Sequence, residues 1–390
     1  MITVDDALDH LFSLVSPLNR ETVALKDAAG RVLATDAVAR RDQPPFAASA
    51  MDGYAVSGDA AQPGAQFNVI GEAAAGHGFG GLVGSGQAVR IFTGAPVPEG
   101  ADRIVIQEDV TRDSERITLG DNLGDTTHIR PAGADFKTGD RITAPRVLGA
   151  AEIALLASMN IGTVTVTRKP QVALISTGDE LVMPGEDPGP DQIIASNTFG
   201  LKAMLDGVGA EARILPIARD TRASLEAAFD LARDADLVIT IGGASVGDHD
   251  LVGDVTESLG MKRAFYKVRM RPGKPLMAGR MGDAAMIGLP GNPVSAMVCG
   301  HVFVIPVIRA MLGLGAQRAS RLTARLAHDL TPGGPREHYM RAQVAGGTIT
   351  PASRQDSALL SVLADANALM IRPADDGPRK AGELVEYLSV

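Results

Sequence analysis

Carboxylate and glycine residues gather directly after an apolar run, QVALIS, near the middle of the chain. The loop that follows it, STGDEL, contains Glu180, whose carboxylate could bind a metal ion or move a proton. Gly178 in the same loop would let the backbone approach a ligand closely. The loop could equally begin a helix, with Ser176 or Thr177 as the capping residue and the acids favouring the helix dipole. By itself this loop favours the helix-start interpretation.

A second glycine-rich loop, GGASVGDHD, follows the apolar run DLVITI. The groups in it that could bind phosphate oxygens lie at Gly242, Gly243, Ser245 and Gly247. Two carboxylates, Asp248 and Asp250, are spaced to share a hard cation such as Mg²⁺. His249 between them is a bystander in this interpretation, because no second His or Cys has a matching spacing. The loop therefore predicts a phosphate and metal site at the end of a buried strand.

A third loop, LPGNPVSAMV, joins an apolar run to a helical pattern. The junction consists of Pro290, Gly291, Asn292 and Pro293. A strand-to-helix turn of this rigidity presents backbone N–H groups and the positive end of a helix to its surroundings. It is therefore a place to hold an anion.

Cations are concentrated in the segment FYKVRMRPGKP, although the protein as a whole is acidic. They are Lys267, Arg269, Arg271 and Lys274. If the segment is a strand, alternation places the first three on one face. The segment could be a solvated edge strand whose charges prevent aggregation. With glycine-rich loops nearby, we favour a cradle for an anionic ligand.

The elements that must position these loops alternate as strand, loop and helix from residue 169 to about 315. This order is typical of a doubly wound, parallel α/β domain, whose ligands bind beyond the carboxyl ends of the strands. Residues 1–168 form an N-terminal region, with helical patterns over 2–17 and 149–160 and a β-rich insertion at about 42–145. Short strands over 320–390 indicate a small sandwich or, as we predict, a β-barrel. The fold class is therefore multidomain α/β.

Composition restricts the partners and the location of the protein. The net charge of the 390 residues is −9, so we expect no nucleic acid partner. The single cysteine, Cys299, lies in an apolar run and is interpreted as a core residue. The N-terminus lacks the pattern of a signal peptide, and no uninterrupted apolar stretch reaches the length of a membrane span. We expect a cytoplasmic protein without a membrane partner.

Two further segments, AMDGYAV and RIFTGAPVPEGAD, contain Asp52 and Thr93. Both residues lie in turn signals and could be purely structural. The residues alone therefore predict an α/β domain that binds a phosphorylated or otherwise anionic ligand together with a divalent metal, without naming the reaction.

Six motifs taken together resemble the molybdopterin molybdenumtransferase family, which includes the bacterial MoeA proteins and the E domain of gephyrin. They are, in order, PPFAASAMDGYAV, VRIFTGAPVPEGAD, STGDEL, GGASVGDHD, RPGKP and LPGNPVSA. The resemblance runs nearly end to end. It implies insertion of molybdate into adenylylated molybdopterin, release of AMP, and assistance by Mg²⁺.

The resemblance also implies roles for individual residues. Catalytic positions match Asp52, Thr93, Glu180, Asp220 and Asp250, of which Glu180 and Asp250 would bind metal. Substrate-binding positions match the three strand-end loops together with Lys267, Arg271, Lys274, Pro290 and Pro293. Further candidates, where the sequence departs from the family pattern, are Asp135, Arg336, Arg341 and Ser357. One departure is Ala134, which replaces an acid in the segment before Asp135.

The same resemblance implies an elongated homodimer in which the N-terminal part of one subunit faces the α/β domain of the other. It leaves room for transient contact with other proteins of molybdenum cofactor biosynthesis. Two alternatives remain open. One is a molybdopterin adenylyltransferase or another nucleotide-phosphoanhydride enzyme of the same fold. The other is a non-catalytic scaffold, against which the retained acids argue.

Overall fold

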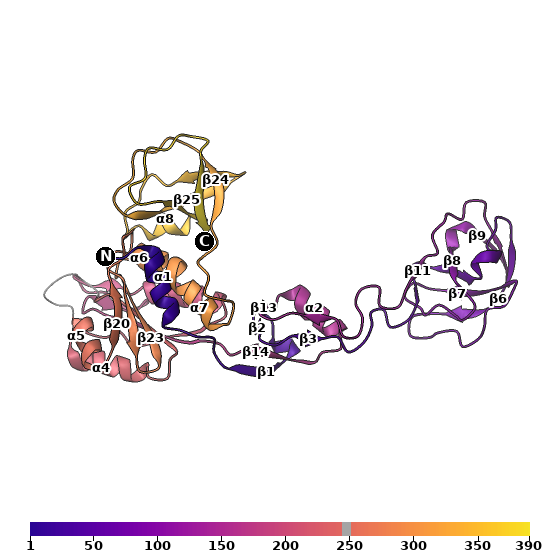
Figure 1. Ribbon diagram of the computed structural model, residues 1–390, viewed down its shortest axis with the longest axis horizontal. Coiled ribbons are helices and arrows are strands. Elements are labelled where there is room, and N and C mark those ends of the chain that lie inside the picture. Colours follow the sequence, from indigo (N-terminus) through magenta and orange to yellow (C-terminus); the bar gives the residue numbers. More distant parts are fainter. Residues whose placement is uncertain (244–250) are drawn as a thin grey trace.

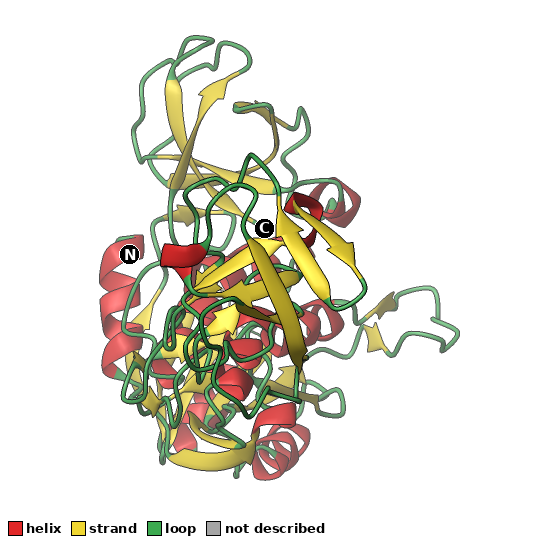
Figure 2. Cartoon of the chain, turned by 90° about the vertical axis from the view of Figure 1, so that its right-hand side faces the viewer, coloured by secondary structure: helices red, strands yellow, loops and turns green. Residues whose placement is uncertain are grey.

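The computed structural model describes residues 1–243 and 251–390 of the chain. The molecule is elongated, with the α/β domain and the C-terminal barrel at one end and a β-rich body at the other (Figure 1). A smaller body lies between them and is here called the middle body. Figure 2 looks along the long axis, with the barrel at the top. Each part has a hydrophobic cluster of its own.

The α/β domain is built on a six-stranded sheet of order β18-β15-β19-β23-β22-β20. Its parallel strands are β15 (Gln171–Ser176), β18 (Glu211–Ile214), β19 (Leu237–Ile241) and β23 (Ala284–Leu289). The strands β20 (Lys262–Tyr266) and β22 (Met277–Met281) run antiparallel along one edge. The central strands are fully buried, as their continuous apolar runs predict.

Helices cover both faces of this sheet, because each face of a parallel sheet is apolar. One face packs against α1 (Val4–Ser13), α3 (Asn197–Gly207), α6 (Pro293–Cys299) and α7 (Ile305–Met311). The other face packs against α4 (Arg222–Leu231) and α5 (Leu251–Ser258). The chain thus winds in both directions from β15, and the doubly wound architecture is confirmed.

The longest apolar helix consists of α6, a π-helical segment η4 (Gly300–Val304) and α7. Among the described residues, Pro293–Met311 is the stretch whose length and composition would allow it to cross a membrane. Because 78% of it is buried inside the protein, it is packed as a core helix is. Cys299 is fully buried in it, and burial raises the pKa of its thiol.

A small strand pair projects beyond the end of β15. It consists of β16 (Leu181–Val182) and β17 (Ile193–Ile194), which pair in parallel. The loop STGDEL therefore leads into a strand and does not begin a helix, so the helix-start interpretation is wrong. The helix after this region begins only at Asn197.

The middle body combines a four-stranded sheet with one helix. The sheet has the order β1-β14-β2-β13, with β1 (Arg20–Ala24), β14 (Thr163–Thr167), β2 (Val32–Leu33) and β13 (Arg146–Val147). The helix is α2 (Ala150–Ser158), and a further pair joins β3 (Ala37–Val38) to β12 (Arg141–Ile142).

Two chain segments cross from this body to the α/β domain. In one of them, Arg168 donates two hydrogen bonds to the carboxylate of Asp236 at the start of β19, at 2.5 and 2.6 Å.

The distal body is a six-stranded sheet of order β8-β5-β7-β6-β10-β9, which confirms the predicted β-rich character of this region. Its strands are β5 (Gly53–Val56), β6 (Gln66–Ala73), β7 (Gln87–Ile91), β8 (Arg103–Ile106), β9 (Val110–Asp113) and β10 (Arg116–Leu119). The pair β4 (Ala48–Ser49) and β11 (Ile129–Arg130) lies where the chain enters and leaves it. Short 3₁₀ turns occur in the distal body at η2 (Gly58–Ala60) and η3 (Gln107–Asp109), and in the middle body at η1 (Leu25–Asp27).

The C-terminal domain is a closed β-barrel, so the predicted barrel is confirmed over the sandwich. Neighbouring strands pair in the order β25-β26-β24-β28-β27, and β27 pairs with β25 to close the ring. The strands are β24 (Leu322–Leu326), β25 (Glu337–Ala345), β26 (Thr348–Pro351), β27 (Ala368–Arg372) and β28 (Leu384–Ser389), with α8 (Leu360–Ala364) between two of them. The short strand β21 (Met270–Arg271) of the α/β domain adds to β25 in parallel and joins the two domains.

Candidate functional site

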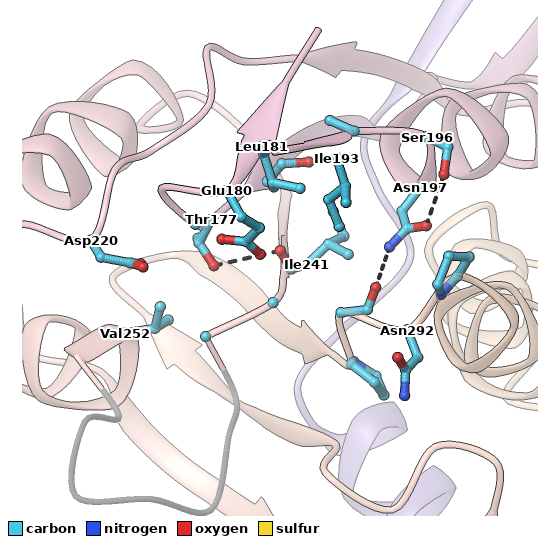
Figure 3. Close-up of a pocket in the computed structure, with 18 of the residues that line it drawn as sticks. Thr177, Glu180, Leu181, Ile193, Ser196, Asn197, Asp220, Ile241, Val252 and Asn292 are labelled. Carbon is cyan, nitrogen blue, oxygen red and sulfur yellow. Dashed lines mark hydrogen bonds between the residues drawn. The ribbon is translucent and has the colours of Figure 1, made fainter. Parts of the chain in front are cut away.

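The strand-end loops of the α/β domain converge on one pocket of about 1130 Å³ (Figure 3). It opens beyond the carboxyl ends of β15, β19 and β23, where the direction of winding reverses and where such folds bind ligands. The predicted residues that line it are Ser176, Thr177, Gly178, Glu180, Asp220, Gly242, Gly243, Pro290, Gly291, Asn292 and Pro293. The structure therefore brings together the described parts of all three loops.

The first loop is buried at its start, and its acidic residue Glu180 is exposed. Ser176 and Thr177 are buried, and the N–H of Thr177 donates to the carbonyl of Ile241 at 3.0 Å. Gly178 has a φ of +142°, and a Cβ at this position would lie 2.2 Å from the carboxylate of Glu180. Glycine is therefore required for Glu180 to fold back over the loop.

Asp220 faces the first loop from the segment after β18. Its N–H donates to the carboxylate of Asp179 at 3.1 Å, and the N–H of Asp179 donates in return to Asp220 at 3.4 Å. Neighbouring Arg219 donates to the carbonyls of Asp179 and Leu181 at 3.1 and 2.9 Å. Sequence reasoning missed Arg219, whose only signal is its place beside Asp220. It fixes the turn that carries Glu180.

The second loop makes a close backbone contact with the first. Gly242 has a φ of +96°, and a Cβ there would lie 2.8 Å from the carbonyl oxygen of Thr177. At Gly243 a Cβ would lie 2.3 Å from the side chain of Val252. Both positions therefore need glycine. The remaining predicted residues of this loop lie outside the described residues: Ser245, Gly247, Asp248, His249 and Asp250.

The third loop is held from two sides. Asn292 precedes the first turn of α6, and Pro293 occupies that turn, where its missing N–H costs little. The amide of Asn292 donates to the hydroxyl of Ser357 in the barrel at 3.2 Å. From the other side, Asn197 at the start of α3 donates to the carbonyl of Gly291 at 2.7 Å. Asn197 also lines the pocket; sequence reasoning missed it, although a polar pair before a helix is a signal.

The basic segment does not form the continuous strand that alternation would require. Strand β20 ends at Tyr266, and Lys267 has a φ of +70°, so the chain turns there. The ammonium of Lys267 lies 4.6 Å from the centre of the Tyr266 ring. Lys267, Arg271 and Lys274 are not among the described residues that line the pocket, although the adjacent Pro275 is. The expected common face is therefore wrong.

The junction between the α/β domain and the barrel gathers cations instead. Arg271 is in register with His338 on β25, and burial together with Arg271 lowers the pKa of His338 to about 4. Arg341 is fully buried and donates to the carbonyls of Arg354 and Asp356 at 3.2 and 2.9 Å. Its Nε and Nη1 atoms find no hydrogen-bond partner in the described part of the chain. Burial lowers the pKa of Arg341, as expected for a cation removed from water.

The remaining weaker candidates are dispersed. Ser357 contacts the third loop, and its carbonyl accepts from the N–H of Val294 at 3.2 Å. Arg336 is half-buried just before β25. Asp135 is exposed between the middle and distal bodies, where its N–H donates to the carbonyl of Gln43. The structure therefore places Ser357 beside the pocket and Asp135 apart from it.

Asp52 and Thr93 lie together in the distal body, at the other end of the molecule from the pocket (Figure 1). The carboxylate of Asp52 accepts from the N–H of Thr93 at 2.7 Å and from its hydroxyl at 2.8 Å. These two hydrogen bonds hold the pKa of Asp52 below its usual range. A Cβ at Gly53 would lie 2.0 Å from the carbonyl oxygen of Val105, so glycine permits the close approach of β5 to β8.

Arg90 supports the Asp52 turn and was missed by sequence reasoning. It donates to the carbonyl of Gly53 at 3.0 Å. Its guanidinium lies 4.6 Å from the centre of the Phe92 ring and 5.2 Å from that of Tyr54. Hydrogen bonding and cation–π contact therefore fix Arg90 between the strands that present Asp52 and Thr93.

The described residues contain no cluster of three or more His, Cys, Asp or Glu side chains suited to a metal ion. The pocket nevertheless includes the carboxylates of Glu180 and Asp220. Mg²⁺ commonly takes one or two protein carboxylates and completes its shell with water and substrate phosphate. The donor set is therefore compatible with Mg²⁺ when a phosphate ligand is present.

An α/β domain with a pocket at its switch point, a β-rich arm and a C-terminal barrel define a known class of molybdopterin biosynthesis proteins. Two crystal structures of molybdopterin biosynthesis MoeA protein from Pyrococcus horikoshii match the whole chain. One has a TM-score of 0.83 at 29% identity and covers 99% of that chain, and the other 0.85 at 26% and 100%.

Sequence comparisons agree with the fold. Family models match residues 2–160 (MoeA N-terminal region, domain I and II), 173–310 (probable molybdopterin binding domain) and 323–390 (MoeA C-terminal region, domain IV). The molybdopterin molybdenumtransferase of a Nostoc species is 36% identical, with 100% of this chain and 94% of that protein covered. That of Haemophilus influenzae is 34% identical, with 99% and 98% covered. The chain belongs to the molybdopterin molybdenumtransferase family, and it is a transferase of molybdenum cofactor biosynthesis. The resemblance of the six motifs is thereby confirmed, and the enzyme hypothesis with it.

Proposed function

We propose that the pocket of the α/β domain binds adenylylated molybdopterin and inserts molybdate into its dithiolene, with release of AMP. The observation that carries this proposal is the convergence of three strand-end loops on one pocket that also contains Glu180 and Asp220. Backbone N–H groups and glycines at such loops suit phosphate oxygens, and carboxylates suit the hard cation that accompanies them. Adenylylated molybdopterin carries phosphates, so it needs both the N–H groups and the cation.

Mg²⁺ in this pocket would be held by the two predicted ligands, Glu180 and Asp250, and by Asp220, which lines the pocket with Glu180. Bound there, it would polarise the phosphoanhydride that breaks. Arg219 and the backbone of the Asp179 turn hold the two acids in place before substrate arrives. The chain's own contribution is therefore to orient the phosphates and to supply fixed oxygen donors.

Molybdate, as a dianion, needs cationic donors close to this pocket. We place it at the junction with the barrel, near Arg341, Lys274 and Ser357. The buried guanidinium of Arg341 has two donor atoms for which the described residues supply no acceptor. Ser357 accepts a hydrogen bond from Asn292 of the pocket loop, so this junction adjoins the proposed substrate site. Arg271 and Lys267 would add positive charge to the same region.

Asp52 and Thr93 enter the reaction if the protein is a homodimer in which the distal body of one copy reaches the pocket of the other. Within one chain the two sites lie at opposite ends of the molecule (Figure 1). Asp52 is ionised at neutral pH and rigidly held, which suits a carboxylate that orients the dithiolene. Each active site would then combine two subunits.

The reaction is tested by giving the purified protein adenylylated molybdopterin, Mg²⁺ and either molybdate or tungstate. We expect AMP release that depends on the oxyanion and yields active cofactor. AMP release without any oxyanion would instead support a nucleotide-phosphoanhydride enzyme. Absence of AMP release under all conditions would overturn the proposal and leave a binding role.

The two-subunit site is tested by mixing two inactive variants, Asp52→Asn and Glu180→Gln. In a mixed dimer one site would contain both wild-type residues, so the mixture should regain roughly a quarter of wild-type turnover. Each variant alone should remain inactive. A mixture that stays inactive, although its subunits exchange, would show that both residues act within one chain. Wild-type turnover of Asp52→Asn alone would show that Asp52 has no role.

We further propose that the protein acts in the cytoplasm and contacts other proteins of cofactor biosynthesis transiently, without nucleic acid or membrane partners. The functional units would follow the predicted division into residues 1–168, 169–315 and 320–390. The net charge of −9 supports the exclusion of nucleic acid.

A further inference from the structure

One wall of the pocket is apolar and uncovered. Leu181 on β16 is in register with Ile193 on β17, and paired residues of neighbouring strands point to the same face. Figure 3 shows the two side chains next to each other at the pocket, close to Glu180. Ile193 is 58% exposed. We call Leu181 and Ile193 the apolar ledge.

The apolar ledge is fixed in position relative to the acid of the pocket. The N–H of Ile193 donates to the carbonyl of Glu180 at 2.8 Å, and Arg219 donates to the carbonyl of Leu181 at 2.9 Å. The N–H of Ala195 closes the strand pair on the carbonyl of Val182 at 2.9 Å. The ledge and Glu180 therefore form one rigid unit, and the ledge does not need to be ordered when a ligand binds.

We infer that the apolar ledge is the seat of a flat heterocycle of the substrate, and this inference rests on the proposed function. Exposure of aliphatic side chains to water is unfavourable, and a planar ring that covers them removes this apolar surface from water. The polar loops that also line the pocket suit phosphates, which cannot cover an apolar wall. Adenylylated molybdopterin joins two flat heterocycles through phosphates, so a ring on the ledge would place the phosphoanhydride over Glu180.

The size of the pocket agrees with this arrangement. Its volume of about 1130 Å³ lies just above the usual range for sites that take a whole small molecule. A phosphate or an oxyanion alone would occupy a small part of it. Anion binding by the loops gives no function to this apolar wall, whereas a heterocycle seated on it would.

The test compares Ile193→Ser with Leu231→Ser. Leu231 at the end of α4 is a matched control, because it is 54% exposed in the same domain and is not among the described residues of the pocket. We expect Ile193→Ser to raise KM for adenylylated molybdopterin roughly tenfold or more, since lost apolar contact in a pocket has this effect. KM for molybdate and the thermal unfolding temperature should not change. Ile193→Leu should restore KM, and Leu231→Ser should behave as wild type.

Two binding arms identify the ring. Titration with AMP and with molybdopterin, each against wild type and Ile193→Ser, should show weaker binding of one of them. A loss for AMP places adenine on the ledge, and a loss for molybdopterin places the pterin there. If Ile193→Ser binds AMP and molybdopterin as tightly as wild type does, the role of the ledge is overturned. The proposed function would still stand, provided that the wild-type protein releases AMP in the presence of molybdate. Dissociation of an oligomer by Ile193→Ser would also overturn it, because the ledge would then be a subunit contact.

Discussion

Asp52 and Thr93 form a two-point contact in which one carboxylate oxygen accepts both the backbone N–H and the hydroxyl of the threonine, at 2.7 and 2.8 Å. The same contact occurs once more between Asp42 and Thr138, with the same two distances. The two pairs have the same local chemistry, and only the first belongs to a predicted catalytic set. Matched substitutions in the two pairs can therefore distinguish a catalytic role from a purely structural one.

Thr93→Val removes the hydroxyl and keeps the backbone N–H. The pKa of Asp52, now held low by both groups, should rise part of the way to its usual value. Asp52 would then take up a proton at a higher pH, so the acid limb of the kcat/KM profile for AMP release should shift to higher pH. Thr138→Val raises the pKa of Asp42 by the same argument and should leave this profile unchanged. Equal shifts in both variants would show that the contact has only a structural role.

Glu180→Gln should lower kcat for AMP release at least about a hundredfold, because the amide lacks the negative charge with which Glu180 would hold Mg²⁺. The fold should persist, since the side chain lies in an open pocket. Titration with Mg²⁺ should show a higher half-saturating concentration. Glu226→Gln on the exposed face of α4 is the control, and it should retain wild-type kinetics. Wild-type turnover of Glu180→Gln would remove the acid from the mechanism.

Arg341→Lys keeps a positive charge and loses the planar fork of donors. Because Arg341 is buried with two donor atoms for which the described residues offer no acceptor, we expect this variant to raise KM for molybdate roughly tenfold or more. KM for adenylylated molybdopterin should stay unchanged, which separates loss of molybdate from a general loss of structure. Arg325→Lys, on β24 of the same barrel and exposed, is the control. A variant with unchanged KM for both substrates would place molybdate elsewhere.

Asp236→Asn should destabilise the protein. Its carboxylate accepts two hydrogen bonds from Arg168 and a third from the N–H of Gln171 at 2.8 Å, and it is largely buried. Weakening such a charged network costs about 1–3 kcal/mol of unfolding free energy, measurable by urea denaturation. Asp230→Asn in the exposed pair with Arg233 should cost at most about 0.5 kcal/mol. If Asp236→Asn lowers the unfolding free energy only slightly, other contacts hold the segment that joins the middle body to the α/β domain.

The sequence by itself determined the strands and the ligand-facing loops of the α/β domain. Strand β15 occupies the run QVALIS without a shift, because a strand buried on both faces is a continuous apolar run. The glycines at 178, 242 and 243 were predicted as ligand-facing positions, and in the structure each of them also meets a neighbour that a Cβ would strike. The apolar run and the residue types of the loop after it can be read from a short stretch of sequence.

Other features depended on contacts between distant segments. The helix start expected at STGDEL became strand β16, because β17 lies beside it and pairs with it. The expected strand through Lys267 turns instead, since its backbone bonds to Ile2 and Leu276. Arg219 and Arg90 support the sites through contacts that no local pattern specifies. Asn197 has a local signal, its place in a polar pair before a helix, but its contact with Gly291 depends on the tertiary structure.

The sequence thus determined which side chains are available for chemistry, because residue type and strand-end position are local properties. Only the tertiary structure decided which of them meet. It placed Glu180 and Asp220 in one pocket, buried Arg341 at the junction with the barrel, and put Asp52 with Thr93 on a separate body. Packing and chain crossing set these distances, and both depend on residues far apart in the chain.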